Sequence, residues 1–314
     1  MRKNHFLIGL LATTLFFVSC GSNESITDTG DNGGGNTSDI NNINKNTIST
    51  GQPKEIARFE FPKVKGGTSD VIVHSTSAYG MTYALEWDHT LRSQRWSCFE
   101  IYKSNNVKNW SRSGWRQTSW GGDPFQKDPL VPKDEQPNVT GEFSGSYYKG
   151  IGSFYERGHI CASEDRVYSK DANEQTFYMT NMQPQVGNLN EKIWSIMEET
   201  VRGWALKTDT LYVCKGGTID SDDKIVDQTK SGFIVPRYFF MAVLAKNSLG
   251  YKAMGFWIEH LDVDQRSKGV TSFVVNIDDL EQKTGIDFFC NLPDDVESKV
   301  EGLSVDKVKI AWGL

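Results

Sequence analysis

Residues 154–166 read FYERGHICASEDR, and this stretch decides how the rest of the chain is interpreted. His159 follows Arg157 across a single glycine. The pair therefore sets an imidazole, mostly neutral near pH 7, beside a cation that can bind phosphate through two parallel hydrogen bonds. Taken alone the tripeptide favours a structural histidine, which is the commoner use of a single His. The residues that follow it change this balance.

Downstream, residues 176–185 read TFYMTNMQPQ and are followed by NLN at 188–190. Beyond them, apolar side chains recur at helical spacing and predict one long amphipathic helix over residues 188–206. Asn190, Trp194 and Glu198 lie four residues apart, so they share one broad face of that helix. The first and last are separated by about 12 Å of rise, and the glutamate leans back toward the amino end.

A hydrated hard cation fits between an asparagine and a glutamate placed in this way. Magnesium prefers oxygen ligands, keeps most of its waters and needs few protein donors. Each residue also has a simpler interpretation: Asn190 as a helix cap, Trp194 as core packing and Glu198 as a solvated charge beside Glu199. The case for a metal site therefore depends on the residues occurring together.

The combination of ERGH at 156–159, TNMQPQ at 180–185 and N-x3-W-x3-E at 190–198 resembles the DNA/RNA non-specific endonuclease family. These are ββα-metal enzymes with an Asp-Arg-Gly-His signature. The resemblance extends over roughly residues 55–314. Glu156 stands where the family usually has Asp, and the extra methylene could shift the turn that aims His159. We expect activity despite this departure.

The resemblance implies a role for each of the residues that match. His159 matches the general base that activates water, Asn190 the direct protein ligand of a catalytic Mg²⁺, and Glu198 the carboxylate that reaches this ion through water. Arg157 matches the signature arginine and Asn181 a site asparagine near His159. Whether Mn²⁺ replaces Mg²⁺ is left open.

A further family arginine precedes an aromatic residue and an Asp-Pro pair. Arg116 is the better candidate for it, because Trp120 and Asp123 with Pro124 follow, and Arg112 is the alternative.

The expected activity is hydrolysis of DNA and RNA phosphodiester bonds to 5′-phosphate products, with little base preference. Such a reaction builds charge on the phosphate oxygens, which a divalent cation and an arginine stabilise. A histidine with a pKa of about 6.5 can take the proton from water. The alternative is a catalytically silent nuclease-fold lipoprotein that binds nucleic acid or a partner protein. The residue types present favour the enzyme, and the sequence indicates no oligomeric state.

The fold class expected is α+β, with a mainly antiparallel central sheet, a ββα-metal active-site motif and a long catalytic helix. β-Branched and aromatic residues predict strands at 83–87, 96–103, 176–180, 210–214, 238–246 and 252–258. A second helix is predicted over residues 277–283, with Gly285 as its left-handed cap. The sequence NSLG at 247–250 predicts a hairpin turn.

Charge is distributed unevenly along the chain. The formal net charge is -6, which argues against a generally basic coat for nucleic acid. Residues 92–133 nevertheless hold eight basic and three acidic side chains, with four tryptophans among them. This segment suits a phosphate backbone flanked by stacked bases, but a solvated loop pinned by core tryptophans is the interpretation that the segment alone favours.

The amino end predicts export. Arg2 and Lys3 precede an apolar stretch, residues 6–18, that is long enough for a signal peptide and too short to span a bilayer. FVSCG at 17–21 resembles the lipobox of bacterial lipoproteins, which implies lipidation of Cys20; an ordinary secretory signal is the alternative. We expect the protein to be exported and lipid-anchored to a bacterial membrane, at the outer membrane or cell surface.

The expected organisation is a lipoprotein signal peptide at 1–20, a flexible polar linker at 21–54 and one endonuclease domain at 55–314. The linker is assigned because its Ser, Thr, Asn, Asp and Gly residues cannot bury enough apolar surface to order themselves. Export permits disulfides, but the sequence leaves open how Cys98, Cys161, Cys214 and Cys290 would pair.

Overall fold

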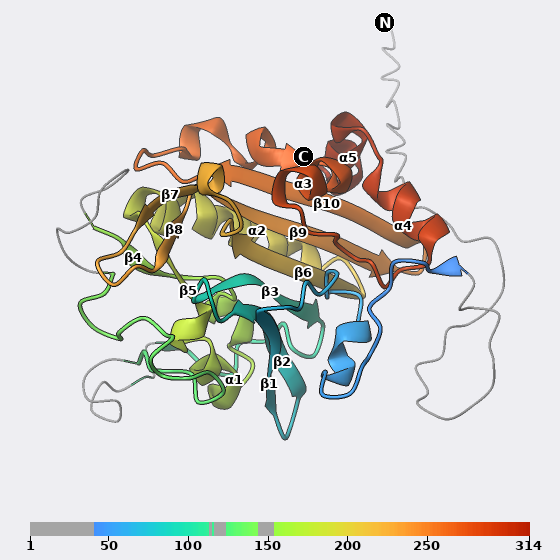
Figure 1. Cartoon of the computed structure of the whole chain (residues 1–314). Helices are drawn as coiled ribbons and strands as arrows, with labels where there is room; N and C mark the ends of the chain where they lie inside the picture. The colour runs from blue at the N-terminus through green and yellow to red at the C-terminus, as the bar shows by residue number, and fades with distance from the viewer. Residues whose placement is uncertain (1–40, 113–114, 116–123, 144–153) are drawn as a thin grey trace, which may run out of the picture.

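A seven-stranded antiparallel sheet forms the centre of the molecule in the computed structural model, which describes residues 41–112, 115, 124–143 and 154–314 (Figure 1). The strand order is β1-β2-β3-β6-β9-β10-β11. Their bounds are β1 (Ser69–Thr76), β2 (Gly80–Asp88), β3 (Ser93–Tyr102), β6 (Thr210–Gly217), β9 (Tyr238–Asn247), β10 (Gly250–Glu259) and β11 (Val274–Val275). The expected α+β class with an antiparallel sheet is confirmed.

The sheet is buried on both faces. Successive side chains of a strand point to opposite faces, so Val213 of β6 joins one apolar cluster while Tyr212 and Cys214 join the other. The first cluster includes α2 (Ser195–Ala205) and α5 (Val305–Trp312). The second includes α3 (Ile277–Thr284) and α4 (Asp294–Glu301). Burial of both clusters is the main driving force for this layered arrangement.

A small two-stranded sheet lies on the α2 side of the molecule. Here β4 (Glu156–His159) pairs with β5 (Met182–Gln185) in antiparallel register, with His159 opposite Met182. The chain then enters a π-helical turn, Leu189–Trp194, which continues directly into α2. The order strand, strand, helix is the expected ββα motif. The remaining elements are α1 (Lys170–Gln175) and a hairpin of β7 (Ile225–Gln228) and β8 (Ile234–Pro236).

Most of the predicted elements are confirmed. The strands expected at 83–87, 96–103, 210–214, 238–246 and 252–258 correspond to β2, β3, β6, β9 and β10. Residues 247–250 form the turn between β9 and β10, and Gly285 caps α3 with a φ of 73°. Residues 188–206 are helical as expected, except that the first turn is π rather than α.

The strand predicted at 176–180 is wrong. The segment follows α1, where the Thr176 hydroxyl donates to the Asn173 carbonyl over 2.6 Å, and it then forms a 3₁₀ turn, Met179–Asn181. Phe177, between α1 and this turn, is fully buried. The β-branched and aromatic residues of segment 176–180 therefore pack in the core. Strand propensity cannot distinguish this use from pairing in a sheet, because the same residue types suit both.

The linker predicted at 21–54 is too long. Of this range the structure describes residues 41–54, and several of them bind the domain. Asn42 donates to the Leu292 carbonyl over 2.6 Å, and the buried Asn46 donates to the Ile56 carbonyl over 3.0 Å. Asparagine amides thus hold this segment where apolar side chains are scarce. Residues 42–54 therefore belong to the ordered domain, while Cys20 lies outside the described residues.

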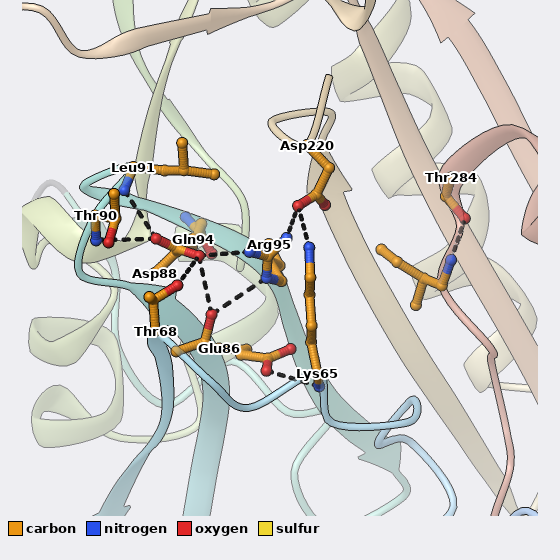
Figure 2. A network of polar contacts seen from close by, with 12 residues as sticks. Lys65, Thr68, Glu86, Asp88, Thr90, Leu91, Gln94, Arg95, Asp220 and Thr284 are labelled. Carbon is orange, nitrogen blue, oxygen red and sulfur yellow. Dashed lines mark hydrogen bonds and ion pairs between the residues drawn. The ribbon is translucent and has the colours of Figure 1, made fainter.

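The basic segment at 92–133 is partly structural. Figure 2 shows the buried Arg95 bound to Asp88 and Asp220, and Lys65 bound to the same Asp220 carboxylate over 2.8 Å. Trp96 is fully buried in the second cluster. The buried Arg95 thus ties β2, β3 and the segment after β6 together, and neither Arg95 nor Trp96 is available to a nucleic acid.

The cysteines Cys98, Cys161, Cys214 and Cys290 are all buried as free thiols. Within the described ranges, no helix combines the length and the apolar composition needed to cross a membrane.

Candidate active site

The cavity beside β4 collects residues from distant parts of the chain. It has a volume of about 410 Å³, and His159, Arg157, Asn190 and Glu198 all line it. The imidazole and the asparagine, 31 positions apart in the sequence, thus face one space. The ββα unit produces this result, because β4 delivers the histidine and the π-helical turn after β5 delivers the asparagine.

The local sequence of β4 explains how this strand forms one wall of the cavity. Arg157 and His159 are two residues apart, so both side chains leave the same face of the strand. Gly158, between them, lies against Gln185 of β5: a Cβ at this position would come within 2.3 Å of the Gln185 Cδ. A glycine therefore leaves room for the Gln185 side chain, while its two neighbours face the cavity.

His159 is held in an apolar and positively charged environment. Its ring lies 5.5 Å from that of Phe125 and 5.2 Å from that of Phe177, measured between centroids. Burial lowers the pKa of His159 to about 3, and the charges of Arg112, Lys215 and Arg157 act in the same direction. The imidazole is therefore neutral at pH 7. Its buried Nε2 has no hydrogen-bond partner among the described residues, which leaves this nitrogen as an acceptor.

Asn190 is fixed by the residue in which this chain departs from the family signature. Its Nδ2 donates to Glu156 Oε2 over 2.7 Å. Within the described part of the chain, nothing donates to its Oδ1, so the amide oxygen is the ligand atom that remains. Burial raises the pKa of Glu156, and the bond from Asn190 opposes that shift. The π-helical turn that carries Asn190 is a feature often found at functional sites.

Glu198 is paired with a lysine that sequence reasoning missed. Lys215 of β6 contacts the Glu198 carboxylate, and the lysine side chain is only 1% exposed. Burial raises the pKa of Glu198, while the Lys215 charge opposes that shift. The sequence did contain one indication of this pair, a lysine inside the apolar strand sequence LYVCKGG. A lysine buried in such a strand is nearly always paired with an acidic group.

Two arginines line the cavity against aromatic rings. The Arg157 guanidinium lies 3.7 Å from the centroid of Phe125, and its Nη1 donates to the Val139 carbonyl over 3.0 Å. Arg112 lies 5.2 Å from the centroid of Phe177. Cation–π contact restricts the orientation of both groups. Arg112, the alternative upstream arginine, is thus present in the cavity, whereas Arg116 lies outside the described residues.

Asn181, expected as a site asparagine near His159, lies beside the residues that follow His159, but it does not line the cavity. It is fully buried behind β4. Its Nδ2 donates to the carbonyls of Cys161 and Thr176 over 2.9 Å, and its Oδ1 accepts from the Cys161 amide over 2.8 Å. Asn181 therefore positions the backbone that follows His159. Burial raises the pKa of the Cys161 thiol to about 12, so this cysteine is not an activated nucleophile.

The donor set of the cavity fits a hard divalent cation. Asn190 offers an amide oxygen, and carboxylates come from Glu156, Glu191 and Glu198. All of these are oxygen ligands of the kind that Mg²⁺, Mn²⁺ and Ca²⁺ prefer. No cysteine lines the cavity among the described residues, so the set does not favour softer ions.

A neutral histidine, two restrained arginines and an oxygen-rich donor set on a ββα motif define the class of metal-dependent nucleases. The comparison with known proteins agrees. The chain belongs to the DNA/RNA non-specific endonuclease family, whose model matches residues 68–295. This range includes β4, β5 and α2, and it ends within α4.

Individual relatives are distant but carry consistent names. The chain is 29% identical over 195 residues to Nuclease C1 of Cunninghamella echinulata var. echinulata, covering 56% of this chain and 77% of the relative. It is 27% identical over 226 residues to a nuclease of Nostoc sp., covering 70% and 75%. A chain in the crystal structure of the EndoG/EndoGI complex superposes with a TM-score of 0.61 at 21% identity, covering 82% of this chain and 100% of that one. This last likeness shows a shared fold.

Proposed function

We propose that this protein is a Mg²⁺-dependent endonuclease that hydrolyses phosphodiester bonds of both DNA and RNA, with a histidine as general base. The observation that carries the proposal is the single cavity shared by His159 and Asn190, with Arg157 and Arg112 in its wall. Family membership supports the reaction class.

His159 acts first, by accepting a proton from the attacking water. Its low pKa keeps the ring neutral, and Nε2 is the nitrogen with no partner among the described residues. A base of low pKa is a weak proton acceptor. The negative charge of a bound phosphate partly offsets the arginine charges that depress the pKa of His159, so substrate binding makes the ring a stronger base.

Arg157 and Arg112 bind the non-bridging phosphate oxygens. Both guanidinium groups lie against aromatic rings, so little side-chain freedom is lost when a phosphate binds. Their charges oppose the negative charge that develops in the transition state. No side chain in this set reads a base edge, which is consistent with low sequence preference.

Asn190 Oδ1 would hold the divalent cation directly, and Glu198 would reach it through water. A hard cation bound there supplies positive charge to the phosphate and stabilises the leaving 3′ oxygen. The products are 5′-phosphate and 3′-hydroxyl ends. We assign Mg²⁺ as the ion, with Mn²⁺ as a substitute of similar ligand preference.

A digestion series tests the proposal against the silent binding module. Supercoiled plasmid and a structured RNA are incubated with the protein in Mg²⁺, in chelator, and with the His159→Ala variant. We expect cutting in Mg²⁺ only, and a loss of about 10²- to 10⁴-fold in the variant. His89→Ala is the matched control, because His89 pairs with Glu135 and Asp70 away from the cavity. Intact nucleic acid in every lane would favour the binding module, and undiminished cutting by His159→Ala would remove the assigned base.

Export and lipid anchoring at Cys20 complete the proposal. They rest on the sequence pattern of residues 1–21, because the structure describes none of these positions. Mass spectrometry of the mature protein tests them: an acylated amino terminus at Cys20 is expected, and an unmodified terminus farther along would end this part of the proposal.

A further inference from the structure

A second group of carboxylates lies on the other face of the central sheet, away from the cavity. One ligand oxygen from each of Asp278, Glu281 and Glu301 lies within 4.8 Å of the other two. Asp278 and Glu281 are three residues apart on α3, so they share one face of that helix, and Glu301 is the last residue of α4. Both helices pack in the second apolar cluster, whereas α2 belongs to the first.

Glu301 makes this group more than a set of surface acids. Its side chain is only 6% exposed, yet its Oε1 has no hydrogen-bond partner within the described ranges. A buried carboxylate oxygen without a partner is costly, and such atoms in native structures call for an explanation such as an unseen ion. Burial raises the pKa of Glu301 to about 10, and the charges that act on it most are those of Glu281 and other carboxylates.

The backbone around Glu301 is held close to the other two acids. Asn276, the N-cap of α3, donates to the Leu303 carbonyl over 3.0 Å, which ties the end of α4 to the start of α3. A Cβ on Gly302 would lie 3.3 Å from Asp278 Oδ2, so the chain passes close to that carboxylate. The C-terminal end of α4 carries the negative end of the helix dipole. A cation bound among the three carboxylates would therefore be stabilised by this helix end as well.

We propose that Asp278, Glu281 and Glu301 form a structural Ca²⁺ site that pins α3 to the end of α4. Three carboxylates, which can each bind through one or both oxygens and leave room for water, suit the six to eight oxygen ligands and flexible geometry of Ca²⁺. Mg²⁺ demands a stricter octahedron and keeps several waters, so it suits the catalytic cavity better. The site stabilises the fold and does not take part in hydrolysis.

The test measures Ca²⁺ binding without relying on activity. The Asn190→Ala variant, in which the catalytic ligand is removed, is freed of metal with chelator and titrated with CaCl₂ by calorimetry and thermal unfolding. We expect one Ca²⁺ per chain and a rise in the unfolding midpoint of about 5 to 10 °C at a hundredfold excess over Kd.

Two further substitutions in that background locate the site. Glu301→Gln keeps the shape and should abolish both the binding and the midpoint shift. Asp278→Asn, at an exposed position that tolerates change, should weaken Ca²⁺ binding at least tenfold. Asp295→Asn is the matched control on α4, because Asp295 pairs only with the exposed Lys299 among the described residues. The proposal is overturned if the Asn190→Ala protein shows no Ca²⁺-dependent shift, or if Glu301→Gln and Asp278→Asn bind Ca²⁺ as the control does.

Discussion

The Nδ2 atom of Asn190 donates a hydrogen bond to Oε2 of Glu156 over 2.7 Å. This bond joins the π-helical turn to β4, the two elements that carry the proposed metal ligand and the proposed base. It also fixes which end of the amide remains for a cation, since an amide that donates through nitrogen presents its oxygen elsewhere. The longer side chain of Glu156, compared with the Asp usual in the signature, is therefore engaged rather than misplaced.

Glu156 is expected to act by orienting Asn190, and two substitutions separate orientation from charge. Glu156→Ala removes the acceptor and should lower the apparent affinity for Mg²⁺ by about 10- to 100-fold, as loss of a ligand's supporting partner does. Glu156→Gln retains an oxygen acceptor and should recover most of that loss. The readout is the cutting rate as a function of Mg²⁺ concentration, with Glu199→Gln as the control on the exposed side of α2. Equal defects in both Glu156 variants would point to charge instead.

His159 is expected to stay neutral well below pH 6.5. The unfolded chain protonates an imidazole near pH 6.5, whereas the pKa of the folded group is about 3. Between these values the unfolded state binds more protons, so this group makes the protein less stable as pH falls from 6.5 toward 3.

An NMR titration of the histidine rings in metal-free protein checks this order. The pKa of His89 is raised by its bonds to Glu135 and Asp70, so His89 should protonate before His159. Burial lowers the pKa of His260 to about 4, so His260 should protonate only below pH 5. The signal that is lost in the spectra of His159→Ala belongs to His159, and a midpoint above pH 6 for that signal would contradict the proposed environment.

The Lys215 and Glu198 pair is expected to be strongly coupled. Lys215→Met leaves Glu198 buried without its cation and should destabilise the fold by about 3 to 5 kcal/mol. The double variant Lys215→Met/Glu198→Gln should regain most of this stability, because neither charge is then left unpaired. Urea unfolding of the four proteins in the cycle gives the coupling energy. Additive effects would mean that the two groups do not interact.

Asn181 is expected to affect stability as well as activity. Asn181→Ala leaves the amide and carbonyl of Cys161 and the carbonyl of Thr176 without their partner. At about 1 kcal/mol or more for each buried group, the loss should be about 3 kcal/mol in the free energy of unfolding. Denaturant unfolding measures it. Cutting should fall mainly through kcat, since the altered backbone follows His159; a change confined to KM would argue for direct contact with substrate.

The site could be predicted from the sequence where residues are close in the chain or share a helix face. The resemblance of the motifs at 156–159, 180–185 and 190–198 to the family gave His159, Arg157, Asn190 and Glu198 their expected roles, and helical spacing placed the last two on one helix face. Lys215 was not found, because it reaches Glu198 from another strand and only the fold brings the two together. Asn181 was found, but its side chain turns behind β4, and the direction of a buried side chain is not encoded in spacing.

The fold was predictable where hydrophobic patterning was unambiguous. The long strands β9 and β10 have continuous apolar runs and a clear turn between them. Residues 176–180 have a similar composition but form a turn. Their apolar side chains are buried in the core without pairing in a strand. The ordered segment 42–46 was taken for linker because its hold on the domain comes from hydrogen bonds, which leave no hydropathy signal.

Docking of residues 42–46 also constrains how a lipid-anchored molecule would stand on a membrane. Ile43 and Asn44 bind Asp294 and Glu297 of α4, on the face of the sheet opposite α2. If Cys20 carries the lipid, the 21 residues from 21 to 41 would span at most about 75 Å at full extension. Because residues 42–46 bind the face of the sheet opposite α2, a tether would join the molecule on the side away from the cavity, and the cavity would stay accessible to polymers from the surrounding medium.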